Sequence, residues 1–249
     1  MKKLYGFTKA ISFILITITL SGCGQEEVNI EDLDYRMGQG VFLDRKPFNG
    51  IAVEYRSDGA KKSQSEIKDG FVDGWNTKFY RNGQPSRKKQ VTYNHRKDEP
   101  EEIGESWDYY ENGKEASFSY TNENDERHGV WKKWNEEGRL LSEKEFNNGN
   151  SVGKHKRWNS DGLLVSTEHY DADGQKHGEF IEACDNEQVK FHGEYEHGKQ
   201  TGAHQYWFCD GQQEKSQEYS NGKPVGKYEQ YANDGKLIAQ RNYLNDGSG

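Results

Sequence analysis

The chain has 249 residues, of which 31% are hydrophobic and 31% are charged, and its formal net charge is −8. An acidic chain lacks the basic surface that non-specific nucleic-acid binding requires, so no nucleic-acid partner is expected. Low hydrophobicity is typical of disorder, but 6 Trp, 15 Tyr, 11 Phe and only 4 Pro favour a thin, repetitive β structure with a small core of aromatic rings.

Residues 1–22 have the organisation of a targeting segment. Three lysines give it a positive start, and residues 11–20 form an apolar run that is long enough for a signal peptide and too short to cross a bilayer. The next residues, Leu20-Ser21-Gly22-Cys23, resemble the lipobox of bacterial lipoproteins. This resemblance implies that Cys23 becomes the first mature residue and carries the acyl chains of an envelope membrane anchor. The alternative is an ordinary secretory signal with a chance cysteine.

The two segments after the lipobox are not periodic. Residues 23–32 are acidic and lack strand periodicity, which predicts a solvated tether. In Gram-negative lipoproteins, Asp directly after the lipidated cysteine commonly retains the protein in the inner membrane. Gly24 stands there in this chain, so the resemblance favours the outer membrane if the source is Gram-negative. Residues 33–48 are predicted to be a first strand or an incomplete repeat that caps the periodic part.

The remainder of the chain, within a predicted repeat domain of residues 33–249, is built from units of about 24 residues. Each unit starts with a glycine, carries an Asp-Gly or similar turn near its middle, and in seven of eight units has an aromatic residue five positions after the glycine. Asp-Gly between short aromatic runs indicates a β-hairpin. The predicted fold is all-β: an elongated single-layer antiparallel sheet of eight stacked hairpins, or about sixteen strands. The opening glycines are Gly50, Gly74, Gly104, Gly129, Gly153, Gly178, Gly202 and Gly226.

The repeat pattern resembles a known family. The matching features are the recurring Gly-x-[Trp/Tyr/Phe/His]-x-x-[Trp/Tyr], the Asn/Asp-Gly turn, and unit ends such as Phe146-Asn-Asn-Gly149 and Tyr219-Ser-Asn-Gly222. They resemble the bacterial variant of the MORN (membrane occupation and recognition nexus) repeat over about residues 46–249. Members of this variant are often labelled antitoxin-like, but no toxin-facing residue can be carried over to this chain.

Three irregularities lead to further expectations. Residues 94–102 form a polar, Pro-containing insertion, which predicts a protruding loop between the second and third units. The sixth unit has Ala183 in the aromatic position, and its turn reads Asp185-Asn186, where Asn186 is expected to take a positive φ. Rings two and five residues after an opening glycine have opposite parity. A local bulge is predicted to aim both into one groove, and the alternative is rings on both faces.

Cys184 and Cys209 are the cysteines left once Cys23 is assigned to lipidation. They lie one repeat apart, each just before a mid-unit turn, and equivalent positions of stacked units are neighbours. Because the compartment outside the inner membrane is oxidising, a disulfide is predicted in preference to two free thiols.

The aromatic residues of the central and later units are the candidate binding face, the alternative being that they form the core of the sheet. No metal site or cofactor is expected, because the histidines that precede glycines suit a turn position and lack a zinc-like ligand set. No catalytic residue is expected, since no hydrolase, metalloprotease, phosphate-binding or dinucleotide motif is present. The candidate face comprises Trp131, Trp134, Trp158, Tyr206 and Trp207, and the histidines are His128, His177, His192 and His197.

These observations predict a non-catalytic, lipid-anchored protein of the bacterial envelope. Its repeat sheet would be a scaffold that binds another protein or an envelope polymer, and Cys23 would connect it to the membrane. The alternative function is an antitoxin-like or immunity-like neutraliser that occludes a toxin.

Overall fold

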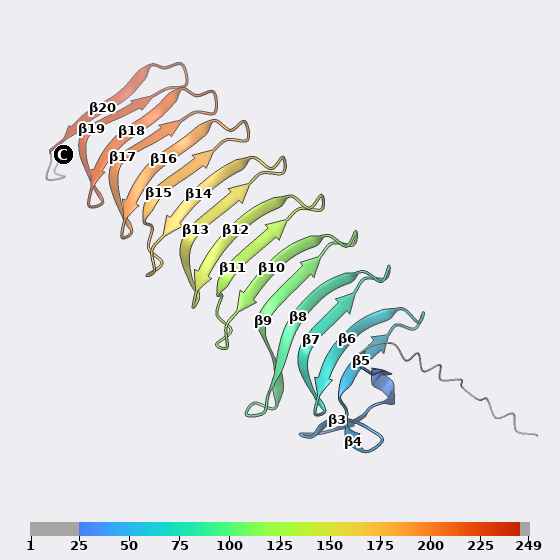
Figure 1. Ribbon diagram of the computed structural model, residues 1–249. Coiled ribbons are helices and arrows are strands. Elements are labelled where there is room, and N and C mark those ends of the chain that lie inside the picture. The colour runs from blue at the N-terminus through green and yellow to red at the C-terminus, as the bar shows by residue number, and fades with distance from the viewer. Residues whose placement is uncertain (1–24, 245–249) are drawn as a thin grey trace, which may run out of the picture.

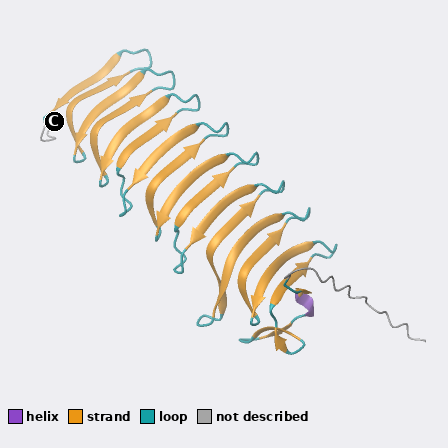
Figure 2. Ribbon diagram, viewed as in Figure 1, coloured by secondary structure: helices purple, strands orange, loops and turns teal. Residues whose placement is uncertain are grey.

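The computed structural model describes residues 25–244. The targeting segment 1–22 and Cys23 therefore lie outside the described residues. Nearly all of the described chain is strand and turn (Figure 2), and its single helix is the short 3-10 helix η1, Ile30–Asp32. Among residues 25–244, no helix has the length and hydrophobicity needed to span a bilayer.

Eight hairpins stack into one long, curved and open antiparallel sheet (Figure 1). From β5 to β20, each strand pairs with the strands that precede and follow it in the sequence. This confirms the predicted elongated single-layer sheet of hairpin repeats. The bounds are β5 Gly50–Tyr55, β6 Lys61–Lys68, β7 Phe71–Phe79, β8 Pro85–Asn94, β9 Glu99–Tyr109, β10 Glu115–Thr121, β11 Gly129–Trp134, β12 Leu140–Asn147, β13 Asn150–Trp158, β14 Leu164–Tyr170, β15 Gly178–Ala183, β16 Val189–Glu196, β17 Lys199–Trp207, β18 Gln213–Ser220, β19 Lys223–Tyr231 and β20 Leu237–Tyr243.

The mid-unit turns share one hydrogen-bonding pattern, which the first unit illustrates. The N–H of Arg56 donates to the carbonyl of Ala60 at 2.8 Å, and the N–H of Gly59 donates to the carbonyl of Arg56 at 2.9 Å. Gly59 has φ +84, so the loop is a type I turn followed by a left-handed residue. The Asp58 carboxylate accepts the N–H of Ala60. The two residues therefore have different roles: the Asp side chain accepts a backbone hydrogen bond within the turn, and the Gly adopts the positive φ.

The sixth unit keeps this turn without a glycine. Glu187, with φ +65, occupies the left-handed position, so the prediction that Asn186 would do so is wrong. Asn186 instead stands where Asp58 stands in the first unit, and its side-chain oxygen accepts the N–H of Gln188 at 3.3 Å. The pair that corresponds to Asp58-Gly59 of the first unit is therefore Asn186-Glu187, and not Asp185-Asn186.

Five of the eight opening glycines lie at bulges, as predicted, namely Gly74, Gly104, Gly153, Gly202 and Gly226. In the second unit, the pairing between β6 and β7 passes from Ser65↔Asn76 to Ile67↔Val72, so β7 carries extra residues around Gly74. Gly74 has φ +131. The bulge lets each unit bend before the strand continues to the next turn.

The bulge does not bring the two rings of a unit into one groove, and that prediction is wrong. Beyond the bulge, β13 pairs with β14 through His155↔Glu168 and Arg157↔Ser166, and the register shift at Trp158↔Leu164 places the extra residue on β14, so β13 itself stays regular. His155 and Trp158 are three residues apart on this strand, so they point to opposite faces. We call the face that carries His155 the ladder face and the face that carries Trp158 the reverse face.

The N-terminal end of the sheet is covered by residues that were predicted to form a solvated tether. β1 (Glu27–Asn29) adds to β5 as a parallel strand, and the N–H of Ile51 donates to the carbonyl of Glu26 at 2.8 Å. The first hairpin has no preceding unit, so its edge would otherwise present unpaired backbone groups. The expectation for residues 23–32 is therefore corrected for the residues from 26 onward.

Residues 33–48 cap the sheet as a separate unit. β2 (Asp34–Arg36), β3 (Gly40–Leu43) and β4 (Lys46–Pro47) form their own three-stranded sheet, which does not continue the hairpin stack. Phe48, Ala52 and Ile67 are buried together beneath it. This cluster is a compact apolar core at one end of a molecule that is otherwise one layer thick.

The insertion at residues 94–102 protrudes, but as a hairpin rather than as a loop. β8 and β9 continue to pair through Tyr93↔Pro100 and Asn94↔Glu99, and only residues 95–98 form the turn. Figure 1 shows the β8–β9 hairpin extending beyond its neighbours. The polar composition of this segment predicted a loop, but strands that are exposed to solvent on both faces have an equally polar composition.

Candidate functional site

A continuous row of rings runs along the ladder face from β11 to β18. Its members alternate between the second residue after an opening glycine and the aromatic residue near the end of the following strand, so each ring meets the next across neighbouring strands. We call this row the aromatic ladder. Its ring-centroid separations are Trp131–Phe146 5.6 Å, Phe146–His155 5.5 Å, His155–Tyr170 4.8 Å, Tyr170–Phe180 5.8 Å, Phe180–Tyr195 4.8 Å, Tyr195–His204 5.1 Å and His204–Tyr219 4.8 Å. The ladder is the core of the sheet.

Two members of the ladder are buried histidines, which the sequence analysis did not single out. The Nε2 atoms of His155 and His204 lie 2.8 Å from the carbonyl oxygens of Glu145 and Glu194. A carbonyl only accepts, so each Nε2 carries a proton and donates it. Burial lowers the pKa of His204, which keeps its imidazole neutral. The signal in the sequence was the position two residues after an opening glycine, where histidine alternates with aromatic residues.

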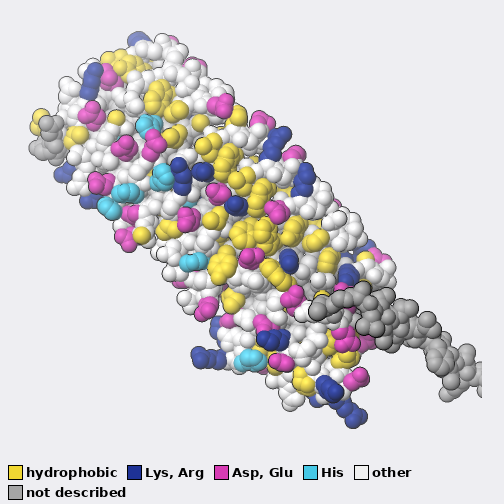
Figure 3. Space-filling view, in the orientation of Figure 1, with side chains coloured by type: hydrophobic (Ala, Val, Ile, Leu, Met, Phe, Trp, Pro, Cys, Tyr) yellow, Lys and Arg dark blue, Asp and Glu magenta, His cyan; other side chains and the backbone are white. Residues whose placement is uncertain are grey.

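The ladder face is hollowed between β14 and β18 into a groove of about 280 Å³, which we call the ladder groove. Phe180 and Tyr195 of the ladder form part of it, and Phe191 and Tyr206 complete it with ring centroids 4.8 Å apart. Both acidic and basic side chains stand around these rings, and the full charged set is Glu168, Lys176, Glu182, Lys190 and Glu214. Figure 3 shows one face of the molecule, on which hydrophobic side chains gather in a band along its length and charged side chains lie on both sides of the band.

The tyrosines of the ladder groove remain protonated. Burial raises the pKa of Tyr206 to about 12 and also raises the pKa of Tyr195. Each hydroxyl can therefore both donate and accept a hydrogen bond. Lys215 places its Nζ 4.2 Å from the centroid of the Tyr206 ring. The groove thus combines flat apolar rings with neutral hydroxyls and a charged rim, an arrangement suited to binding.

The five aromatic residues predicted as one binding face are divided between two faces. Trp131 belongs to the ladder and Tyr206 to the ladder groove, whereas Trp134, Trp158 and Trp207 lie on the reverse face, where strand parity places residues five after an opening glycine. On the reverse face Trp134 stacks on Trp107 at 6.4 Å. All five predicted residues are half-buried. The groove residues Phe180, Phe191 and Tyr195 were not predicted, because the repeat periodicity alone does not show which of the many rings border a recess.

Cys184 and Cys209 form the predicted disulfide, with their Cα atoms 5.8 Å apart. The bond joins the mid-unit turns of the sixth and seventh units. Beside it, the side-chain amide of Asn186 donates to the carbonyl of Cys209 at 2.8 Å. In the loop-entropy description, a covalent link across one repeat contributes about 3 kcal/mol. It holds together the two units that carry much of the ladder groove.

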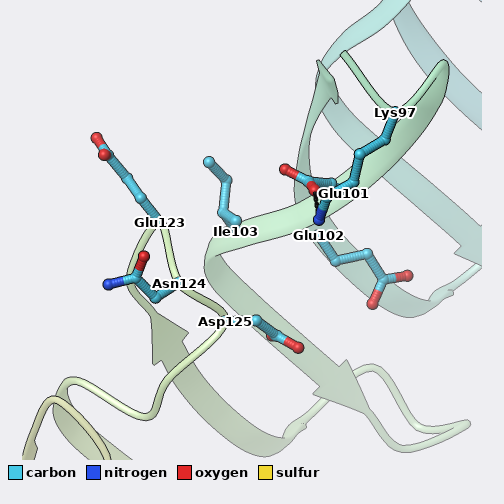
Figure 4. A pocket seen from close by; sticks show the side chains of 7 residues that line it. All are labelled: Lys97, Glu101, Glu102, Ile103, Glu123, Asn124 and Asp125. Atoms are coloured by element: carbon cyan, nitrogen blue, oxygen red, sulfur yellow. Dashed lines mark hydrogen bonds and ion pairs between the residues drawn. The ribbon is translucent and has the colours of Figure 1, made fainter. Parts of the chain in front are cut away.

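A second recess, of about 570 Å³, lies between the β8–β9 hairpin and the loop that follows β10 (Figure 4). Most of its lining side chains are acidic. Lys97 contacts Glu101 at 2.7 Å, and this hydrogen bond lowers the pKa of the Glu101 carboxyl. A carboxyl that acts as a general acid near neutral pH needs a raised pKa. At Glu101 the recess is therefore not arranged for acid catalysis.

The four histidines noted in the sequence have different environments. The Nε2 of His192 lies 2.9 Å from Glu179 in a cross-strand pair, and His128 lies beside the Tyr120 ring. His177 and His197, in contrast, meet Asp171, and the potential ligand atoms of all three lie within 4.8 Å of one another. Sequence spacing gave no reason to expect this meeting, because the residues come from two different loops.

No protein-family model matches the chain, and no curated protein matches it. Among solved structures, a chain in the crystal structure of TcdB2-TccC3-Cdc42 matches 74% of this chain with 12% sequence identity and a TM-score of 0.15. This chain covers 13% of that chain, and so low a TM-score carries no argument about function. The resemblance to MORN repeats stays a prediction from the sequence pattern.

Proposed function

We propose that the protein is a non-catalytic, lipid-anchored component of a bacterial envelope, and that its sheet is a scaffold that binds another protein or an envelope polymer. Cys23 would hold the acyl anchor, and residues 24 onward would present the sheet at the membrane surface. The repeat pattern further supports membership of the bacterial MORN variant.

The observation that carries the binding proposal is the ladder groove. The ladder rings pack against each other from β11 to β18, and between β14 and β18 the face beside them is hollowed and carries the rings of Phe191 and Tyr206. Aromatic side chains set in a recess with a polar rim are the usual centres of binding energy at protein interfaces. A single-layer sheet has no second layer to cover such a recess, so the groove is accessible to a partner.

Covalent capture in intact cells tests this proposal. A photo-crosslinking amino acid replaces Glu182, an exposed residue of the groove, and in a matched control it replaces Lys154, an exposed residue that precedes His155 and so points to the reverse face. We expect a discrete adduct from Glu182 and none from Lys154. Tyr206→Ala in the Glu182 background should weaken capture by about 30-fold, as expected for a central aromatic worth about 2 kcal/mol.

The outcomes distinguish the candidate functions. Adducts of equal intensity from both positions, or none from either, would contradict binding at the ladder groove. A single captured protein that is toxic on its own would favour the neutraliser, whereas an envelope protein or polymer supports the scaffold.

A further inference from the structure

Asp171, His177 and His197 form a compact cluster at the long edge of the sheet opposite the disulfide. Asp171 and His177 begin and end the loop between β14 and β15, and His197 lies in the two-residue turn between β16 and β17. The ring centroids of the two histidines are 5.0 Å apart, and the Nδ1 of His197 lies 2.9 Å from the Asp171 carboxylate. Two imidazoles and one carboxylate therefore converge at one point.

The Asp171 carboxylate is held in place by the backbone of its own loop. One of its oxygens accepts the N–H groups of Asp173 and Gln175, at 3.1 and 2.8 Å, which leaves the second oxygen for His197. The loop thus aims one carboxylate oxygen at the imidazoles.

The lysine of this loop does not neutralise the cluster. Lys176 places its Nζ 4.8 and 5.0 Å from the ring centroids of Phe180 and Tyr195, on the ladder face. Both histidines of the cluster are exposed, whereas Asp171 is half-buried. The cluster is therefore an open arrangement of nitrogen and oxygen donors.

The same loop two repeats earlier provides an internal comparison. Asn122 and His128 begin and end it, and Asn148 has φ +47 in the following turn, as His197 has φ +44. The backbone bonds correspond: His128 donates to Tyr120, as His177 donates to His169, both at 3.0 Å. There the side-chain amide of Asn122 donates to the side chain of Asn148 at 2.9 Å.

The comparison shows that the fold does not require metal-ligand residues at these positions. A pair of asparagines makes the same loop and the same turn, and asparagine is well suited to a positive φ. Asn122 accepts the N–H groups of Asn124 and Glu126, as Asp171 accepts those of Asp173 and Gln175. Asp171 and His197 therefore add metal-ligand chemistry that the loop and the turn do not require.

We propose that Asp171, His177 and His197 bind a divalent transition-metal ion of the zinc class. Three protein ligands of the His₂-carboxylate type, with an open position for water or for a partner's ligand, are an established zinc arrangement. Ligand atoms of a tetrahedral site lie about 3.3 Å apart for bonds of about 2.0 Å, so small rotations of the exposed imidazoles complete the set. This site is independent of the proposed scaffold function and of the ladder groove.

The test is calorimetric titration of the untagged full chain with Zn²⁺ near neutral pH. We expect one Zn²⁺ per wild-type chain and a Co²⁺ form with the absorption of a tetrahedral complex. The variant Asp171→Asn/His197→Asn copies the earlier loop, so its folding should be unchanged by circular dichroism. Losing an outer-shell partner already costs 10–100-fold in affinity, so losing two ligands should cost more than about 100-fold.

A reciprocal graft sharpens the test. Asn122→Asp/Asn148→His, which leaves His128 in place, should create a second site and raise the stoichiometry to two. His177→Gln keeps its backbone bond to His169 and offers an independent way to remove the first site. Absence of Zn²⁺ binding by the wild-type chain, unchanged binding by Asp171→Asn/His197→Asn, or a graft that adds no site would each overturn the assignment.

Discussion

At the scale of single residues, the ladder uses histidine where a purely apolar ring would leave a carbonyl unpaired. His204 is fully buried, packs on Tyr195 and Tyr219, and donates to the carbonyl of Glu194. Phe180 stands at the same place in the preceding unit and supplies the ring alone. An unmade hydrogen bond at a buried carbonyl costs about 1–3 kcal/mol, and the imidazole avoids this cost as long as it stays neutral.

The neutral state of His204 makes stability depend on pH. Its pKa in the folded protein lies below the unfolded value of about 6.5. Between those two pKa values the unfolded chain binds more protons, so the free energy of unfolding falls as the pH drops through that window. We expect denaturant unfolding to show this loss below about pH 6.5 in the wild-type chain, and a flatter dependence in His204→Phe. Parallel pH profiles for the two proteins would show that His204 does not titrate on unfolding.

At the scale of the hairpin, the opening glycine leaves space for a side chain from the preceding strand, and that side chain hydrogen-bonds the backbone next to the glycine. In the second unit a Cβ on Gly74 would lie 2.9 Å from the Cβ of Glu66 and would collide with its carboxylate. That carboxylate accepts the N–H of Trp75 at 3.0 Å, a donor that the bulge takes out of the strand ladder. The glycine thus makes room for the group that satisfies its neighbour.

Alanine at the opening glycine should therefore be costly. Gly74→Ala combines a positive φ with a steric conflict and loss of the Glu66–Trp75 bond, so we expect it to lower the free energy of unfolding by about 2–4 kcal/mol. Gly83→Ala, in the mid-unit turn of the same hairpin, has φ +84 but no atom within 4 Å of the new Cβ. It should cost only about 1–2 kcal/mol. Equal losses in chemical denaturation would mean that close packing at Gly74 contributes nothing.

The repeats could be predicted because their signals are local. A glycine, an Asp-Gly turn and an aromatic residue at fixed offsets define each hairpin, and stacking follows because one hairpin is unstable alone. The parallel strand β1 and the cap had no such signals, since their pairing depends on the free edge of β5. Glu187 was missed because glutamate rarely takes a positive φ, and only the turn's hydrogen bonds reveal its position.

The candidate site was less predictable than the fold. Trp131 and Tyr206 lie on the ladder face, whereas Trp134, Trp158 and Trp207, which were predicted to share one face with them, lie on the reverse face. The opposite parity of the two ring positions allowed either a bulge at the opening glycine or rings on both faces of the sheet. The structure contains both a bulge and rings on both faces. The meeting of His177 and His197 depends on two loops that share an edge, which no spacing in the sequence expresses.

At the scale of the whole molecule, three irregular features lie in the fifth to seventh units. The ladder groove occupies one face, the Cys184–Cys209 bond joins the turns of one long edge, and Asp171 with its two histidines lies on the other edge. The remaining units repeat the scaffold with few additions. In a stack whose units contact only their neighbours, such local changes need not disturb the rest. Specificity is therefore expected in these units.

We propose that Cys23 holds this protein at an envelope membrane, and such an anchor would decide which partners it can meet. Mass spectrometry of the N-terminal peptide of the protein isolated from its native cells tests this most directly. We predict that the mature chain begins at Cys23 and carries the mass of a diacylglyceryl group on the thiol, often with an acyl group on the amine. A mature chain that begins elsewhere, or a Cys23 thiol without lipid, would contradict the account.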